Sequence, residues 1–279
     1  MPHSMFGLVW PLTWPARLYL RKSPCRYGKK VLGRLLNALI LHTTSGTFEA
    51  QLPGGRMATL QFSEVIGRTY LMLGGFEVGE ARLLRELALP GTTAVDVGAN
   101  VGLLSIPLSD AVGDGGRVWA FEPLHATAER LRSNLALNGI TNVDVSELAV
   151  TDVESEALLN VADDPAYHSL GVVYESRGTG QQIVVQTTDL DSIWMQRGSP
   201  SISVIKIDTE GTEAAVVSGA AALIEACRPA VVVEAPSSSA TAAIAALLVP
   251  HGYREAPTKG LQSATRVFVH ADRAQTMVV

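Results

Sequence analysis

Apolar and polar positions follow two alternating patterns along this chain from Thr93 onward. Short, nearly continuous apolar runs are typical of buried strands, and they occur at 93–97, 117–121, 143–145, 183–187, 203–208, 230–234 and 266–270. Segments with apolar residues at helical spacing lie between them, at 77–89, 126–138, 212–226 and 241–248. Strands that alternate with helices predict an α/β protein with a mostly parallel, doubly wound sheet.

The first 75 residues have a different pattern. Apolar side chains recur at helical spacing over 30–41, with basic residues between them. A small β unit is expected over 46–75, with strands and a turn at 47–52, 53–55 and 57–62. We therefore expect a basic helical segment with a small β unit over 1–75, and the main domain over 76–279.

The composition allows a large core and argues against a general nucleic-acid binder. Of the 279 residues, 47% are hydrophobic and 18% are charged, so the chain can bury one large domain or two small ones. The net charge is −5, which gives no overall signal for nucleic acid. Two cysteines, Cys25 and Cys227, form neither a metal-ligand spacing nor a disulfide framework.

The expected location is the cytoplasm, or the inner face of a membrane. Reduced cysteines suit a reducing compartment, and the N-terminus reads poorly as a secretory signal. No apolar run reaches the length of about 18 residues that a membrane-spanning helix needs.

The charge is distributed unevenly along the chain. Residues 1–48 carry +7 and no acidic residue, which leaves −12 for the remainder. One interpretation is a helix packed on the domain. The other is peripheral membrane contact through residues 1–45, with Trp10, Trp14 and Tyr19 at the interface.

The first candidate site follows the apolar run 93–97. Asp96 precedes a turn with two glycines, Gly98 and Gly102, and a helix is expected to begin near Leu103. Small residues let a cofactor approach the backbone. The next strand ends in Glu122, which is placed to hold ribose hydroxyls. Strand, glycine turn, helix, strand and acid together indicate a nucleotide-type cofactor, although the turn could also be purely structural.

The sequence lacks the glycine motifs that bind dinucleotides and nucleoside phosphates, which limits the type of nucleotide. The dinucleotide fingerprint needs three glycines, but Asn100 stands in place of the second and none follows Gly102 at the required spacing. The chain also contains no phosphate-binding loop of the G-x-x-x-x-G-K-[ST] type. A nucleoside without phosphates fits better, and S-adenosylmethionine is such a cofactor. A nicotinamide-dependent oxidoreductase is the alternative.

The second candidate site is the segment 206–213, where a buried strand ends in charged residues. Lys206 and Asp208 are two residues apart and therefore share one face of the strand. Three interpretations are open. In the first, the segment is structural, with a salt bridge and with Glu213 as an acid at a helix start. Alternatively, Asp208 or Lys206 accepts a proton from an acceptor molecule, or Asp208 and Glu210 hold Mg²⁺.

These motifs resemble the FkbM-type S-adenosylmethionine-dependent methyltransferases. The resemblance runs from about Phe76 to Glu234. Its motifs are D-V-G-A-N-V-G at 96–102, F-E-P at 121–123, Asn134 with Asn138-Gly139, K-I-D-T-E-G-T-E at 206–213, and Arg228-Pro229 to Glu234. It implies a seven-stranded class I methyltransferase fold and O-methylation of a hydroxyl on a sugar, glycolipid or polyketide-type natural product.

The resemblance also implies site residues. The cofactor positions carried over are Asp96, Gly98, Asn100, Gly102 and Glu122, and the acidic block is Asp208, Glu210 and Glu213. We add Ala99, Pro123 and Ala149 to the expected cofactor site. Phe76-Glu77, just before the core, is expected to close over the methionine end of the cofactor.

Methyl transfer requires alignment of the attacking oxygen and a base for its proton. Asp208 is the first candidate base and Lys206 the second. His168, in a polar stretch, is a third candidate, with a surface histidine as the plain alternative.

The expected partner is a small-molecule or lipid-linked hydroxylated acceptor, whose identity the sequence does not encode. Its specificity is expected to lie in the loop 152–182 and in the N-terminal region. A non-catalytic adapter that docks on membranes is a further alternative function.

Overall fold

The computed structural model describes residues 14–22, 29–43, 46–162, 178–257 and 260–273. Its internal contacts divide the chain into two units, Met1–Phe76 and Glu77–Val279, a division one residue from the boundary expected from the sequence. Among the described residues, no helix has both the length and the apolar character needed to cross a membrane.

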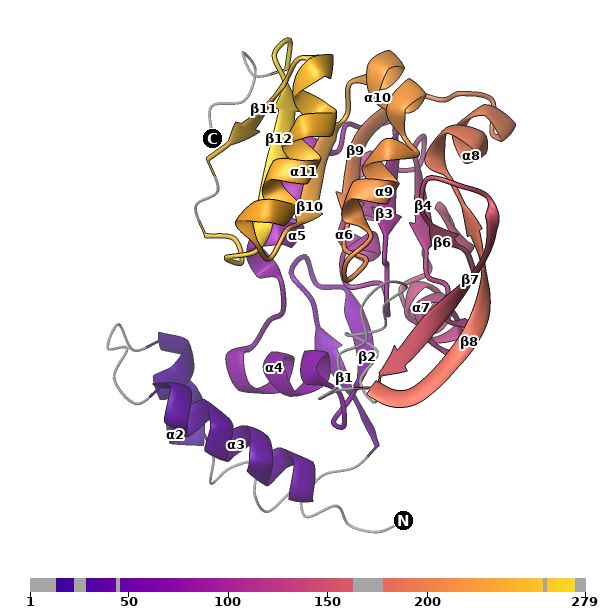
Figure 1. The fold of residues 1–279 in the computed structure, drawn as a ribbon. Coiled ribbons are helices and arrows are strands. Elements are labelled where there is room, and N and C mark those ends of the chain that lie inside the picture. Colours follow the sequence, from indigo (N-terminus) through magenta and orange to yellow (C-terminus); the bar gives the residue numbers. More distant parts are fainter. Residues whose placement is uncertain (1–13, 23–28, 44–45, 163–177, 258–259, 274–279) are drawn as a thin grey trace. The chain divides into compact units, whose positions relative to one another are not determined.

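The second unit is built on a seven-stranded sheet, as the resemblance implies (Figure 1). Its strands in spatial order are β11 (Tyr253–Ala256), β12 (Thr265–His270), β10 (Ala230–Glu234), β9 (Ile202–Ile207), β3 (Thr93–Val97), β4 (Arg117–Phe121) and β5 (Val143–Ser146). The run from β10 to β5 is parallel, and β12 is antiparallel to both of its neighbours. The predicted mostly parallel α/β sheet is confirmed.

Helices cover both faces of this sheet because side chains alternate between the faces along each strand. Odd-numbered strand residues such as Val95 and Ile205 pack under α8 (Leu190–Gln196), α9 (Glu213–Ser218), α10 (Ala221–Cys227) and α11 (Ser238–Leu248). Even-numbered residues such as Ala94 and Val204 pack against α5 (Val78–Leu87) and α6 (Ser105–Val112). Figure 1 shows the two helical layers on either side of the sheet. A further helix, α7 (His125–Leu137), connects β4 to β5.

The single helix predicted over 212–226 is wrong, because two helices, α9 and α10, occupy this range. The break lies at Gly219, where a Cβ atom would be 2.3 Å from the carbonyl oxygen of Thr151. The chain passes so close to another backbone here that only glycine fits. The strand β11, which follows a short 3₁₀ turn at Val249–His251, was also not predicted.

The range 152–182 differs from the expected loop with short strands. Two long antiparallel strands, β7 (Ser155–Ala162) and β8 (Gly178–Thr188), form a hairpin. They make a separate three-stranded sheet with β6 (Ala149–Val150), whereas the strand expected at 143–145 is β5 of the seven-stranded sheet. Residues 163–177, which include His168, lie outside the described residues.

The first unit contains the predicted hairpin, formed by β1 (Thr47–Gln51) and β2 (Met57–Gln61). Three helices accompany it: α2 (Trp14–Lys22), α3 (Lys29–Thr43) and α4 (Val65–Leu73). The helix α4 corrects the expectation that the β unit continues to residue 75. A small core of Ile40, Phe62 and Leu71 joins α3, the hairpin and α4.

Candidate functional site

A row of charged side chains continues one face of the central sheet at the carboxyl ends of its strands. Even-numbered positions of β3, β9 and β10 are apolar along most of the strand, then change to Asp96, Lys206 and Glu234. The register pairs Asp96 with Lys206, and Lys206 with Val232, which precedes Glu234 by two residues. Asp208 follows Lys206 on the same face. Ligands of open α/β sheets bind at this edge.

Asp96 is fully buried and incompletely hydrogen-bonded. Its Oδ2 accepts a hydrogen bond from Ser105 Oγ at 2.6 Å. Its Oδ1 has no hydrogen-bond partner and lies 3.6 Å from Lys206 Nζ. The ion pair with Lys206 compensates the charge of this buried carboxylate, whereas the hydrogen-bonding capacity of Oδ1 is not used within the protein.

Lys206 is the cation that balances these acids. Its Nζ donates a hydrogen bond to the Gly98 carbonyl oxygen at 3.1 Å and lies 3.5 Å from Asp208 Oδ2. Burial by itself would lower the pKa of the ammonium group. The neighbouring carboxylates, above all Asp208 and Asp96, outweigh burial and raise the pKa above its usual value. Lys206 is therefore a protonated cation at neutral pH, which suits it to hold acids rather than to accept a proton.

The glycine turn after β3 is shaped by the protein itself. Gly98 has a φ of +75°, and a Cβ atom there would lie 1.8 Å from the carbonyl oxygen of Asp208. Gly102 also has a positive φ, and its Cβ would be 3.2 Å from Leu131 Cδ1. Gly98 is thus required for the approach of the Asp208 backbone, a constraint the sequence reading attributed to the cofactor.

Glu122, at the end of β4, holds the other side of this turn. Its carboxylate accepts hydrogen bonds from the Asn100 backbone N at 3.0 Å and the Leu124 backbone N at 3.1 Å. Burial raises the pKa of Glu122 to about 7, although these two bonds act in the opposite direction. Asn100 has a φ of +48°, a conformation that asparagine tolerates. Ala99 is buried in the turn, and Pro123 is half-buried beside Glu122.

A small hollow, open to solvent, lies next to the charged row. Its charged lining comes from Lys206, Asp208 and Glu234 at the strand ends and from Glu77 and Glu80 on the α5 side. Its apolar lining includes Leu84, Leu104, Ile207, Val232 and Val233. Carboxyl groups outnumber the cation in this lining, and the remainder of the lining is apolar.

Glu234 is the site residue that the sequence reading missed. It belongs to the strand end next to Asp208, and burial together with a hydrogen bond to Asp208 raises its pKa to about 9. Burial also raises the pKa of Glu77 to about 8. The available signal was an acid ending the apolar strand 230–234, the same pattern that drew attention to Asp96. Its proximity to Asp208 depends on the strand order.

A comparison with family models decides what kind of protein carries this site. The methyltransferase FkbM domain model matches residues 96–255, which is more than half of the chain and contains Asp96, Glu122, Asp208 and Glu234. The chain belongs to the FkbM methyltransferase family. Its seven-stranded sheet, with one antiparallel strand between β10 and β11, is the class I methyltransferase fold.

Relatives of this FkbM-family chain are distant. A protein-L-isoaspartate O-methyltransferase of Aeropyrum pernix is 26% identical over 156 residues, or 56% of this chain and 53% of that protein. Among solved structures, methyltransferase FkbM of Methylobacillus flagellatus KT is similar with a TM-score of 0.46 and 15% identity, over 95% of this chain and 60% of that one. The chain therefore spans about half of the curated relative's length.

A second similar structure is a SAM-dependent O-methyltransferase of Thermotoga maritima. It has a TM-score of 0.40 and 10% identity, and the match covers 83% of this chain and 79% of that one.

Glu213 organises the loop after β9 of the FkbM-family domain. Its Oε1 accepts hydrogen bonds from the backbone N of Thr209 and of Gly211 and from Thr209 Oγ1, at 3.3, 2.8 and 3.2 Å. Glu210 lies within this loop with a φ of +55°. The geometry agrees with the interpretation of Glu213 as an acid at a helix start.

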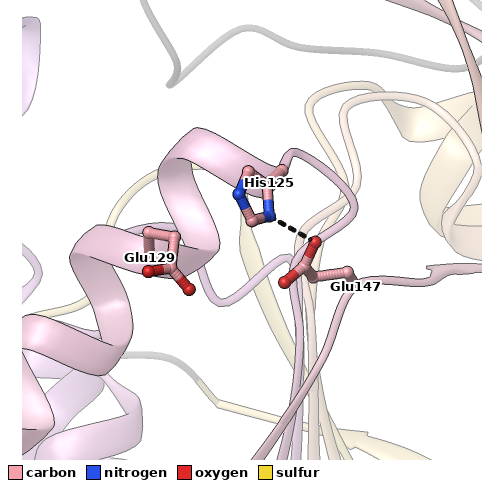
Figure 2. Close-up of side chains that lie close together, drawn as sticks. All are labelled: His125, Glu129 and Glu147. Atoms are coloured by element: carbon pink, nitrogen blue, oxygen red, sulfur yellow. Dashed lines mark hydrogen bonds and ion pairs between the residues drawn. The ribbon is translucent and has the colours of Figure 1, made fainter.

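The predicted Mg²⁺ pair, Asp208 and Glu210, does not belong to a group of three potential ligands within 4.8 Å of one another among the described residues. In the described part of the chain, potential ligands gather within 4.8 Å of one another at His125, Glu129 and Glu147, on α7 and after β5 (Figure 2). One arginine already pairs with both carboxylates of this group. Arg132 Nη1 lies 2.8 Å from Glu129 and 2.6 Å from Glu147, whose pKa it lowers.

The side chain of Ala149, another expected cofactor residue, is buried in the small sheet. It packs with Leu159 and Val185. Of the three candidate bases, Asp208 and Lys206 meet at the charged row, whereas His168 is outside the described residues.

Proposed function

We propose that this protein is an S-adenosylmethionine-dependent O-methyltransferase that acts on a hydroxyl of a sugar, glycolipid or polyketide-type natural product. The observation that carries the proposal is the charged row, where Asp96 at the end of β3 pairs with Lys206, which lines a carboxyl-rich hollow at the ends of β9 and β10. Membership of the FkbM methyltransferase family supports the reaction type.

The residues at the ends of β3 and β4 suit a cationic, phosphate-free nucleoside. Asp96 Oδ1, which accepts no hydrogen bond within the protein, and the buried carboxylate of Glu122 are hydrogen-bond acceptors for amino and hydroxyl groups. The cation of the row, Lys206, is held by Gly98 and two aspartates rather than presented to a phosphate. When bound, S-adenosylmethionine supplies a methyl group activated by its sulfonium centre.

Asp208 accepts the proton of the acceptor hydroxyl in this proposal. Glu234, whose pKa is raised to about 9, holds a proton at neutral pH and donates a hydrogen bond to Asp208. Asp208 then remains the ionised partner, which Lys206 also stabilises. The hydroxyl proton passes to the Asp208 carboxylate, and a carboxyl of the pair returns a proton to solvent. Lys206 positions this carboxylate and keeps its own proton.

The hollow also bears on the acceptor. Glu77, Glu80, Asp208 and Glu234 line it with a single lysine, and the raised pKa values of Glu77 and Glu234 keep these two carboxyls protonated at neutral pH. In the part of the chain that the structure describes, no cation besides Lys206 lines the hollow to attract a phosphate or carboxylate on the acceptor. Neutral polyhydroxylated groups are favoured, since carboxylates accept hydrogen bonds from hydroxyls. We therefore expect neutral glycosides to be methylated in preference to their acidic counterparts.

Labelled methyl transfer tests this proposal. The full chain is incubated with S-adenosylmethionine labelled in the methyl group and with pairs of neutral and acidic glycosides, and the products are analysed by mass spectrometry. Asp208→Asn should lower turnover by ~100- to 10,000-fold, because a positioned base contributes that much. The affinity for the cofactor should stay within about threefold, because Asp208 acts on the acceptor hydroxyl in this proposal.

Two results of that experiment would contradict the proposal. Turnover that survives in Asp208→Asn would show that Asp208 is structural. Label on nitrogen or carbon of the product would exclude O-methylation. Glu225→Gln, an exposed acid on α10, is the matched control and should behave as the unmodified protein.

A further inference from the structure

The exposed face of α3 has the wrong composition for a helix that faces water. The residues exposed along it follow the i, i+3, i+4, i+7 spacing of a single face: Val31, Arg34, Leu35, Ala38 and Leu39. Val31 and Leu35 are 61% and 64% exposed. A surface helix ordinarily places polar and charged residues there.

The opposite side of α3 already supplies the contacts that hold the helix. Leu36 and Ile40 are buried, and Ile40 belongs to the core formed with Phe62 and Leu71. Asn37 accepts a hydrogen bond from Arg68 Nε on α4 at 2.7 Å. The helix is thus apolar on two sides: among the described residues, packing with α4 and the hairpin accounts for one side, and Val31 and Leu35 are exposed on the other.

The charges around this face all have one sign. Residues 14–43 contain no Asp or Glu. Arg34 lies on the exposed face and Lys22, at the end of α2, is exposed as well. Two other cations stabilise the helices: Arg17 donates to the Leu71 carbonyl oxygen and Lys29 to the Leu20 carbonyl oxygen, both through side-chain nitrogens.

We propose that the exposed face of α3 binds the surface of an anionic lipid bilayer, with the helix axis in the plane of the interface. Val31 and Leu35 enter the boundary between headgroups and acyl chains, while Arg34 and Lys22 meet anionic headgroups. An apolar stripe flanked by cations is the composition that such interfacial helices use. No described helix is able to cross the membrane, so the contact is peripheral.

Charge complementarity favours an anionic bilayer over a second copy of the chain as the partner of this face. Two copies joined through α3 would bring identical positive surfaces together, and like charges across an interface are unfavourable. An anionic bilayer offers the opposite charge together with an apolar layer. The proposal is independent of the methyl-transfer chemistry, so a failure of either leaves the other standing.

Vesicle flotation with the full chain tests the proposal. Vesicles of phosphatidylcholine alone are compared with vesicles of phosphatidylcholine and phosphatidylglycerol in equal parts. The unmodified protein should float with the anionic vesicles and much less with the neutral ones. Val31→Ser combined with Leu35→Ser should lower the partition coefficient at least about tenfold, because two apolar side chains that enter the bilayer are lost.

Matched variants separate this surface from general stickiness. Leu137→Ser with Met195→Ser removes two exposed apolar side chains from α7 and α8 and should leave binding within about twofold of the unmodified protein, because these residues lie outside the proposed surface. Lys22→Gln with Arg34→Gln should weaken binding to anionic vesicles and reduce its dependence on salt. Circular dichroism verifies that each variant is folded. If the Val31→Ser, Leu35→Ser variant is not folded, the Lys22→Gln, Arg34→Gln variant still tests the proposal.

Three results would overturn the proposal. They are failure of the unmodified protein to float with anionic vesicles, equal flotation of the serine and unmodified proteins, and a dimer in sedimentation velocity that the serine variant dissociates. The last would assign the face to a second copy.

Discussion

Lys206 determines the charge balance of the site at the scale of single residues. It is 8% exposed and is the cation nearest to Asp96, which is fully buried. A buried charge is tolerated when it is paired and becomes costly when its partner is removed. The same lysine fixes the end of β9 to the turn after β3 through its bond to the Gly98 carbonyl oxygen.

Removal of Lys206 should therefore reveal the cost of an unpaired Asp96. We expect Lys206→Met to lower the free energy of unfolding by about 3–5 kcal/mol, the range for breaking a buried ion pair. Urea denaturation measures the change. Adding Asp96→Asn to Lys206→Met should recover at least about 1 kcal/mol, because the uncompensated charge is then gone. Additive losses in the double variant would contradict this account.

At the scale of elements, the closest backbone contacts of the site lie in its turns rather than in its strands. The strand β3 and the strand β9 pair along their length, and the backbone of Asp208 then crosses directly over Gly98. The loop that follows is held by Glu213 through three hydrogen bonds. These contacts set the position of the Asp208 side chain relative to the turn at 98–102.

Two glycines with the same φ provide a direct test of that contact. Gly98 and Gly91 both have a φ of +75°, but a Cβ at Gly91 meets nothing within 4 Å. Gly91→Ala should cost only the strain of a left-handed residue, about 1–2 kcal/mol. Gly98→Ala should cost at least about 2 kcal/mol more, because its Cβ would overlap the Asp208 carbonyl oxygen. Equal losses in thermal unfolding would show that the approach of the two backbones is unimportant.

The elements show which parts of the fold the sequence could predict. Buried strands such as 93–97 and 230–234 were found because their apolar runs are local. The break at Gly219 was missed because its cause, the Thr151 carbonyl oxygen, is distant in sequence. The helix α4 and the strand β11 were missed because tertiary packing determines them more than local pattern.

The site was predictable to a similar extent and for the same reason. Asp96, Glu122, Lys206 and Asp208 each end an apolar run or lie near its end, which is a local signal. Glu234 becomes their neighbour only because β9 lies between β3 and β10 in the sheet. The purpose of Gly98 was likewise hidden, since the atom that requires glycine belongs to Asp208.

At the scale of the whole molecule, three carboxyl groups of the site make the stability of the fold depend on pH. Burial raises the pKa of Glu122, Glu77 and Glu234 to about 7, 8 and 9, from 4.5 in the unfolded chain. The folded state therefore binds more protons than the unfolded state between these values. The contribution of these three groups to the free energy of unfolding is fully present below pH 4.5 and is lost as pH rises through about 7 to 9.

We expect the melting temperature to fall between pH 6 and pH 9 for this reason. Glu234→Gln should flatten that slope and melt higher than the unmodified protein at pH 9, because glutamine cannot ionise beside Asp208. Scanning calorimetry at both pH values measures the change, with the exposed Glu225→Gln as the control. A slope that is unchanged in Glu234→Gln would place the titrating groups elsewhere.

Calorimetric titration of the full chain tests the central claim, that a phosphate-free adenosyl sulfonium cofactor binds at the ends of β3 and β4. We predict saturable binding of S-adenosylmethionine and none of NAD⁺. Glu122→Gln should weaken cofactor affinity by about tenfold, the effect of losing one hydrogen bond to a charged group, while it retains one oxygen for the Asn100 or Leu124 amide. Binding of NAD⁺ in place of S-adenosylmethionine, or an affinity unchanged by Glu122→Gln, would contradict the account.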